Sequence, residues 1–262
     1  MKENPILAIA AHSKKEGSMA GYSVNSMGLN PVNFSIGFAD SQMNQCYCPT
    51  IPFKFMVAAG FNKQPEKKPR LYPVNHSKRL YSLGRYSALS ALNAVSMGGS
   101  FGKLFGKVNL RIEKFATKNN AQMGTSYSWG ASFAGAELSE TTISLARIGN
   151  SLIVIETDDE ILVKLTQDEF HYLDGTSFAP DKIEWSLLPL NNVRCAAFFV
   201  SEEPILPLSS DVIVPEAMEL FIDGIQRVWH NKRPKAAIKS ILDEQVVEQD
   251  YALIIYVAGD KY

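Results

Sequence analysis

Cysteine, histidine and net charge are all scarce in this 262-residue sequence. It contains 3 Cys and 4 His, and 26 basic residues nearly balance 27 acidic ones, which gives a formal net charge of -1. Three cysteines without a regular spacing do not form the pattern of a disulfide framework, and we expect a reducing, cytoplasmic compartment. The balanced charge gives no whole-molecule attraction to nucleic acid or to an anionic membrane, so we expect neither as a partner.

Long apolar runs and interdomain linkers are missing as well. The apolar run over 5–11 is too short to cross a bilayer, and Glu3 with the lack of a small-residue cleavage site argues against a signal peptide. No segment rich in Pro, Ser and Gly divides the chain into halves that could each bury a core. We therefore expect one domain spanning residues 1–262.

Apolar periodicity predicts mostly strands, with helices in two pairs. Strand patterns cover 6–11, 33–39, 54–58, 132–138, 142–148, 151–156, 161–165, 183–188, 195–200 and 252–257. Helical patterns cover 85–95 and 104–117, and a second pair begins at Pro215 and Pro234. Gly149-Asn150 and 157–160 are predicted as hairpin turns, because each joins two strand patterns.

This order of elements limits the folds that the chain can adopt. Strands, two helices, an antiparallel meander, two helices and a closing strand are expected if two sheets pack face to face with helix pairs outside them. We therefore predict an α+β fold, a four-layer α-β-β-α sandwich of two mostly antiparallel sheets. Periodicity alone fits other α+β folds equally well.

Two short motifs select among these folds. Residues 146–151 read Ala-Arg-Ile-Gly-Asn-Ser and residues 165–170 read Leu-Thr-Gln-Asp-Glu-Phe, with a strand, a turn and a strand between them. Their order and spacing resemble the middle of the metal-dependent protein phosphatases of the 2C type, in which the motifs usually read Gly-Asp-Ser and Leu-Thr-x-Asp-His. The similarity can be followed from about residue 34 to residue 257, and it implies the layered sandwich of that family.

The same resemblance implies that the early metal and phosphate ligands have been replaced. Where the family has Arg-x-x-Asn-Glu-Asp, residues 41–46 place Ser41 at the arginine and Cys46 at the metal-binding aspartate. Where the family ends a strand with Val-x-Asp-Gly, the chain keeps Gly60 but has Ala59 at the aspartate that bridges two metal ions. A methyl group cannot offset the repulsion between two dications about 4 Å apart, and a cysteine thiolate is a soft ligand unsuited to Mg²⁺ or Mn²⁺.

The later motifs are better preserved. Glu202 stands at the aspartate of the family's Ser-Asp-Gly, and Asp250 is the one family metal ligand that is unaltered. The segment 130–132, Gly-Ala-Ser, matches the family's Gly-Thr-Thr, with Gly124 opening a rival match. We expect no catalytic residues and no cofactor, and as the alternative a Mn²⁺ or Mg²⁺ ion held by a vestigial pair, Asp250 and Glu202.

A basic segment follows Gly60 directly. Residues 63–85 contain three prolines and one acidic residue, Glu66, and the resemblance places them at the rim of the former active cleft. We expect a loop there that docks an acidic or phosphorylated protein partner. The residues expected to bind it are Lys63, Lys67, Lys68, Arg70, Lys78 and Arg79.

Three functions remain open on the sequence. The first is a catalytically inactive phosphatase 2C-like protein, a pseudophosphatase that serves as a protein-binding scaffold or regulator. The second is a divergent Mn/Mg-dependent serine/threonine phosphatase that uses Asp250, Glu202 and a relocated carboxylate such as Asp40. The third is a structural subunit of a larger assembly. The sequence leaves the partner and the oligomeric state open.

Overall fold

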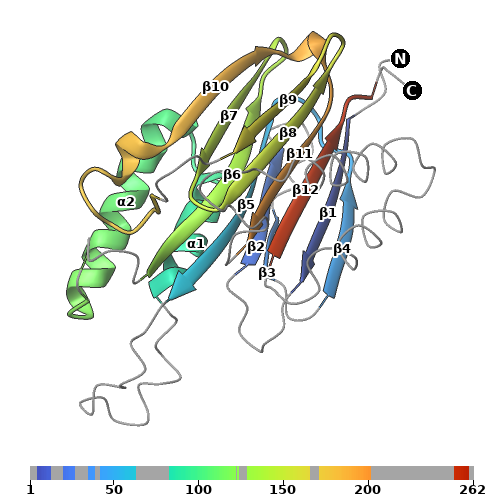
Figure 1. Cartoon of the computed structure of the whole chain (residues 1–262). Helices are drawn as coiled ribbons and strands as arrows, with labels where there is room; N and C mark the ends of the chain where they lie inside the picture. The colour runs from blue at the N-terminus through green and yellow to red at the C-terminus, as the bar shows by residue number, and fades with distance from the viewer. Residues whose placement is uncertain are drawn as a thin grey trace, which may run out of the picture.

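The fold is built from two six-stranded sheets that face each other (Figure 1). The structure is a computed structural model, and it describes residues 5–12, 20–26, 35–38, 42–62, 83–121, 123, 129–165, 171–201 and 251–259. The first sheet has the order β4 (Gln42–Tyr47), β1 (Ile6–His12), β12 (Tyr251–Val257), β11 (Val193–Ser201), β8 (Ser151–Thr157) and β9 (Ile161–Leu165). The second has the order β10 (Glu184–Pro189), β7 (Thr142–Ile148), β6 (Trp129–Leu138), β5 (Phe53–Asn62), β2 (Ala20–Ser26) and β3 (Ser35–Phe38).

Alternation along β5 shows how the two faces of the second sheet are used. Phe53, Phe55, Val57 and Ala59 point into the core between the sheets, where the Phe55 ring meets Phe198 of β11 edge-on at 4.7 Å between centroids. The residues between them point to the outer face, because successive side chains of a strand alternate. Both faces of β5, one of the two middle strands of the second sheet, are therefore buried.

Helices α1 (Leu83–Ala94) and α2 (Phe101–Lys118) cover this outer face. Small residues of α1 pack on β5, and the Phe105 ring of α2 stacks on Phe133 of β6 with centroids 4.5 Å apart. Two short 3₁₀ helices, η3 (Ala179–Lys182) and η4 (Leu190–Asn192), flank β10. The predicted α+β sandwich of antiparallel sheets is confirmed, whereas the predicted second helix pair lies outside the described residues.

Three details differ from the sequence prediction. Strands β2 and β4 were not predicted, and β5 continues past Gly60 to Asn62. Gly149-Asn150 is not a hairpin turn: β7 belongs to the second sheet and β8 to the first, so these two residues carry the chain from one sheet to the other. The predicted turn over 157–160 does close a hairpin, in which the Thr157 amide donates to the Glu160 carbonyl at 2.9 Å.

Candidate metal and phosphate site

Strand pairing gathers the motif segments at one end of the sandwich, which we call the motif end. In the first sheet Tyr251 pairs with both Ser201 and His12, and His12 pairs with Gln42. In the second sheet β5 ends and β6 begins at the Asn62 and Trp129 pair, and the connection at 149–150 links the two sheets there. Antiparallel pairing therefore brings together the segments that the resemblance identified from distant parts of the chain.

Ala59 lies at this end, inside the space between the sheets. Its side chain is 1% exposed, and its strand neighbours are Ala20 and Ser132. Ala11 and Ala252, which pair with each other in the first sheet, line the same core. The described lining around Ala59 therefore consists of alanines and Ser132, and residue 59 offers a methyl group where the resemblance places a bridging carboxylate.

Gly60 points the other way, toward α1. A Cβ at this position would overlap the backbone of Gly84, and a Cβ on Gly84 would overlap the backbone of Phe61. The two glycines thus permit α1 to lie directly on β5. The glycine that the resemblance assigned to a metal site has a packing role here.

Residues 149 and 150, which connect β7 to β8, are held against β6 at the motif end. Gly149 has φ +73° and lies against Ser132, so a side chain here would be strained and would clash. The Asn150 amide donates to Ser132 Oγ at 2.9 Å, which fixes the connection to β6. This contact shows that Gly130-Ala131-Ser132, rather than the segment opened by Gly124, is the β6 segment that lies against the Gly149 turn.

Asn150 also carries an unsatisfied group. The residue is 6% exposed, and its Oδ1 atom is buried without a hydrogen-bond partner among the described residues. Buried acceptors are nearly always paired with protein, water or an ion, so an orphaned amide oxygen indicates a missing donor or cation. The resemblance offered a signal for this residue, because it places Asn150 at the aspartate of Gly-Asp-Ser, but we did not predict it as a site residue.

Arg147 is a buried cation near the motif end, and its hydrogen-bonding capacity is used for structure. Its Nη2 and Nε donate to Glu184 Oε2 at 2.7 and 3.1 Å, and Nη1 donates to the Ser151 carbonyl at 3.2 Å. Burial lowers the pKa of Arg147, and the Glu184 carboxylate opposes that shift. Arg147 therefore ties β7 to β8 and β10.

The remaining predicted site residues are not brought together by described contacts. Cys46 pairs through its backbone with Ala8, four residues along β4 from Gln42, so it does not lie at the motif end. Glu202 and Asp250 lie outside the described residues, although each is the sequence neighbour of a member of the Ser201 and Tyr251 pair. Their assignment as metal ligands stays a prediction.

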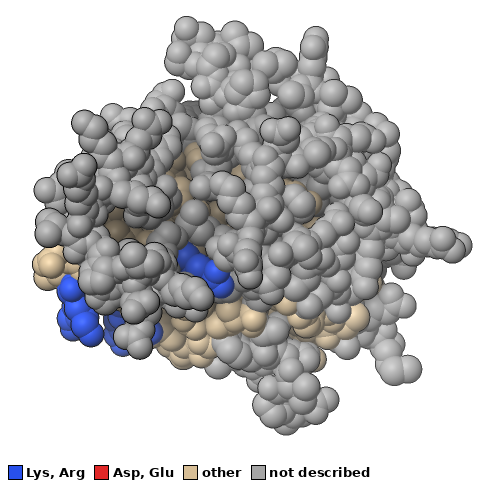
Figure 2. Space-filling model, turned by 90° about the horizontal axis from the view of Figure 1, so that it is seen from below, with Lys and Arg blue, Asp and Glu red and all other residues tan. Residues whose placement is uncertain are grey.

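The predicted basic segment also lies largely outside the described residues. Lys63, Lys67, Lys68, Arg70, Lys78 and Arg79 all fall in the part that is not described, and residues 83–85 belong to α1 rather than to a loop. The segment joins the end of β5 to the start of α1, and both flanks lie at the motif end. Where described residues are visible from below the molecule, Figure 2 shows Lys and Arg but no Asp or Glu.

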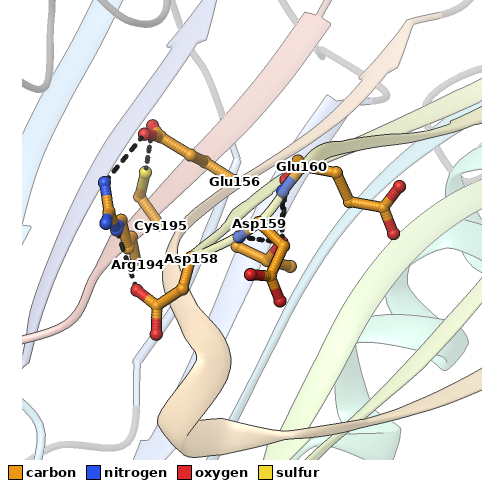
Figure 3. Close-up of polar contacts among 7 residues, drawn as sticks. Glu156, Asp158, Asp159, Glu160, Arg194 and Cys195 are labelled. Atoms are coloured by element: carbon orange, nitrogen blue, oxygen red, sulfur yellow. Dashed lines mark hydrogen bonds and ion pairs between the residues drawn. The ribbon is translucent and has the colours of Figure 1, made fainter.

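Within the described part of the chain, no cluster of three or more His, Cys, Asp or Glu side chains is arranged to hold a metal ion. The acidic run near the β8–β9 hairpin lies at the opposite end of the sandwich and is used otherwise (Figure 3). Asp158 accepts from Arg194 Nε at 2.9 Å, and Glu156 accepts from the Cys195 thiol at 3.2 Å. Asp159 and Glu160 point away from that group.

Comparison with solved structures finds this fold in bacterial phosphatases. A bacterial serine phosphatase is 10% identical, with 97% of this chain and 99% of that chain covered and a TM-score of 0.55. The catalytic domain of the serine/threonine phosphatase PstP, in complex with two manganese ions, is 10% identical over 98% and 100% of the chains, with a TM-score of 0.56. RsbX in complex with magnesium is 12% identical over 98% of each chain, with a TM-score of 0.54.

By sequence, no family model and no curated protein matches the chain. Within the described residues no helix is both long and apolar enough to cross a membrane.

The structural neighbours correct one expectation. We expected no cofactor because Ser41, Cys46 and Ala59 replace ligands, but PstP carries manganese and RsbX magnesium on this same fold. That expectation is wrong, since structures with this fold are found with a bound metal ion. Ala59, buried at the position to which the resemblance assigns the bridging carboxylate, offers no ligand for a pair of metal ions.

The resemblance seen in two short motifs is thus borne out across nearly the whole length of the structure. The chain has the fold of the metal-dependent protein phosphatase 2C family.

Proposed function

We propose that this protein is a phosphatase 2C-like regulator that binds a divalent metal ion and a protein partner but does not hydrolyse phosphoesters. The observation that carries the proposal is Ala59, which is buried among alanines at the position where the resemblance requires a bridging carboxylate. Phosphate monoester hydrolysis needs among the largest rate accelerations known, and a two-metal site supplies it by activating water and neutralising the phosphate together. A chain without the bridge loses that cooperation.

The proposal keeps one metal ion. Glu202 and Asp250 are hard oxygen ligands next to the paired Ser201 and Tyr251, and Mn²⁺ or Mg²⁺ favours such ligands. The orphaned Asn150 oxygen at the same end adds support, since a cation or its bound water would satisfy it. Such an ion would attract an anionic ligand, and these residues would hold and orient it.

Turnover of a phosphoserine peptide in Mn²⁺ tests the loss of hydrolysis. We expect release of phosphate no faster than in buffer containing Mn²⁺ alone. Asp250→Asn is the diagnostic variant, and Asp159→Asn on the exposed β8–β9 turn is the matched control. Mn²⁺-dependent turnover that Asp250→Asn abolishes and Asp159→Asn preserves would overturn the proposal.

That same outcome would establish the second candidate, a divergent Mn/Mg-dependent serine/threonine phosphatase. The structural neighbours favour it specifically, because they include serine/threonine phosphatases that cover the whole chain. In that case a carboxylate at a position other than residue 59 must complete the site. Asp40→Asn would then reduce turnover as strongly as Asp250→Asn.

The partner is proposed to be an acidic or phosphorylated protein that docks on the basic segment. Support comes from the composition of 63–82 and from the basic, non-acidic character of the described residues visible at this end (Figure 2). Fluorescence anisotropy with a phosphopeptide should show weaker binding for Lys67→Glu with Lys68→Glu than for wild type. The control pair, Lys103→Glu with Lys107→Glu on exposed α2 positions, should bind as wild type does, and equal losses in both pairs would reject the segment as the docking site.

A cytoplasmic location is part of the proposal. Cys48 is exposed and Cys195 is buried, and neither forms a disulfide, which is consistent with a reducing compartment.

A further inference from the structure

Strand β10 forms a lateral edge of the second sheet (Figure 1). It pairs with β7 on one side, from the Glu184 and Arg147 pair to the Pro189 and Thr142 pair. On its other side no described strand pairs with it. A strand in this position presents a row of backbone donors and acceptors that another strand can join.

The direction of each backbone group on β10 follows from one hydrogen bond. The Leu190 amide, just past the strand, donates to the Thr141 carbonyl at 2.9 Å, so residue 190 faces β7. Because backbone groups alternate in direction along an antiparallel strand, Glu184, Ser186 and Leu188 also face β7. The N–H and C=O groups of Trp185 and Leu187 therefore point outward, away from the sheet.

The side chains of the same two residues are exposed and apolar. Trp185 is 45% exposed and Leu187 is 65% exposed, and both project on the face that carries α2, where the Trp185 ring lies 6.0 Å from the Phe105 ring. Residues 185–188 read Trp-Ser-Leu-Leu and contain no charge. Exposed edges of soluble proteins are usually protected by Lys, by other charges, by Pro or by bulges. In β10 such residues stand only at the two ends, Glu184 and Pro189, and the centre has none.

We propose that β10 pairs with β10 of a second copy of this chain, antiparallel and centred on Ser186. In this register Trp185 lies opposite the partner's Leu187, and Leu187 lies opposite the partner's Trp185. Each pair exchanges two backbone hydrogen bonds, which gives four in all, and each places an aromatic ring beside an aliphatic side chain on the same face. The two second sheets become one continuous sheet across a twofold axis.

Self-complementarity is the reason to name a second copy as the occupant. The outward backbone groups and the exposed side chains belong to the same two residues, and in a pairing of the strand with itself both sets match when the axis passes through Ser186. The contact centres on few side chains, whereas stable interfaces bury about 800 Å² on each partner. We therefore expect a reversible dimer with a dissociation constant in the micromolar range, on the order of 10 µM.

Sedimentation equilibrium of the full chain over a concentration series tests the dimer. Leu187→Pro removes the outward N–H without removing a bond to β7, since residue 187 faces away from it, and edge strands tolerate proline there. Loss of two of the four hydrogen bonds should raise the dimer dissociation constant about tenfold or more. Leu110→Lys on α2, where the residue is 53% exposed, is the control and should leave the constant unchanged.

Disulfide trapping tests the register. In a background with Cys46→Ser and Cys48→Ser, Ser186→Cys faces its own copy across the axis and should crosslink under mild oxidation. Leu188→Cys, two residues along the same face, would lie about 13 Å from its copy and should not crosslink. A chain that stays monomeric at all concentrations, or that dimerises equally well as Leu187→Pro, would overturn the proposal; crosslinking of Leu188→Cys in place of Ser186→Cys would overturn the register.

Discussion

The two ends of the sandwich are held together differently. At the motif end alanines fill much of the space between the sheets, the Asn150 amide donates to Ser132, and Arg147 pairs with Glu184. At the opposite end three described ion pairs involve Lys54 or Arg194. Buried Lys54 lies 3.6 Å from Glu137 and donates to the Gly99 carbonyl, and Glu137 also accepts from the Phe101 amide at the start of α2.

This contrast separates what the fold requires from what the chemistry requires. The charged contacts at the opposite end fix α2 and the β8–β9 hairpin, so they serve the sandwich itself. At the motif end the lining around Ala59 is rich in alanine, and the buried Arg147 joins β7 to β8 and β10. The comparison teaches that the framework of the sandwich does not depend on metal, because the packing at Gly60 and the hydrogen bond from Asn150 to Ser132 are made by the chain alone.

Placing a carboxylate at the motif end should have the largest effect. Ala59→Asp buries an unpaired charge in an apolar core and should lower the free energy of unfolding by about 3 kcal/mol or more. Because desolvation favours the neutral acid, the loss should be smaller at acidic than at neutral pH. Chemical denaturation measures this, and Mn²⁺ should recover part of the loss for Ala59→Asp but none for the uncharged control, Ala59→Asn.

Disturbing the packing of α1 on β5 at the motif end should reduce stability nearly as much. In Gly60→Ala the new Cβ overlaps the Gly84 backbone, so α1 must shift, at a cost of about 3 kcal/mol. Gly98→Ala, where a Cβ meets open space, should change stability by less than about 0.5 kcal/mol. Equal thermal stability of the two variants would show that α1 does not rest on β5 as described.

Breaking the buried pair at the opposite end should cost somewhat less. Glu137→Gln leaves the Lys54 ammonium, whose side chain is 5% exposed, without its counter-ion, and should reduce stability by about 2 kcal/mol. Exposed Glu140→Gln is the matched control and should be neutral within about 0.5 kcal/mol. If Lys54→Met restores the stability of Glu137→Gln, the loss came from the uncompensated cation.

Breaking the exposed ion pair at the opposite end should have the smallest effect on stability. Arg194 and Asp158 are 45% and 43% exposed, so solvent screens their interaction although the atoms are 2.9 Å apart. Asp158→Asn should change the free energy of unfolding by at most about 1 kcal/mol, with less effect at high salt. A larger loss that persists at high salt would mean that this contact is structural in the way that Lys54 and Glu137 are.

Much of the framework could be predicted from the sequence because it follows local patterns. Period-two alternation located β5 to β12 within a few residues, and the apolar stripe of α2 located that helix. Strand β4 was missed because 42–47 is rich in polar residues, as an edge strand can be. Strand β2 was missed although Ala20, Tyr22 and Val24 alternate correctly, because Gly21 and the buried Ser23 lie between them under α1.

Other features depend on contacts that no local pattern encodes. Gly149-Asn150 fits a hairpin turn and a connection between sheets equally well, and only the pairing of β8 with β11 decides between them. The packing role of Gly60 depends on Gly84, 24 residues later. For the candidate site, sequence reasoning identified Ala59 from its motif but missed Asn150, whose unsatisfied oxygen is visible only once its burial is known.

Manganese stoichiometry tests the central claim most directly. Isothermal titration of the wild-type chain with Mn²⁺ is predicted to give one site per chain, lost in Asp250→Asn and retained in Asp159→Asn. Two sites of micromolar affinity in the wild-type chain would contradict the account, because they would show that a dinuclear centre forms without a carboxylate at residue 59.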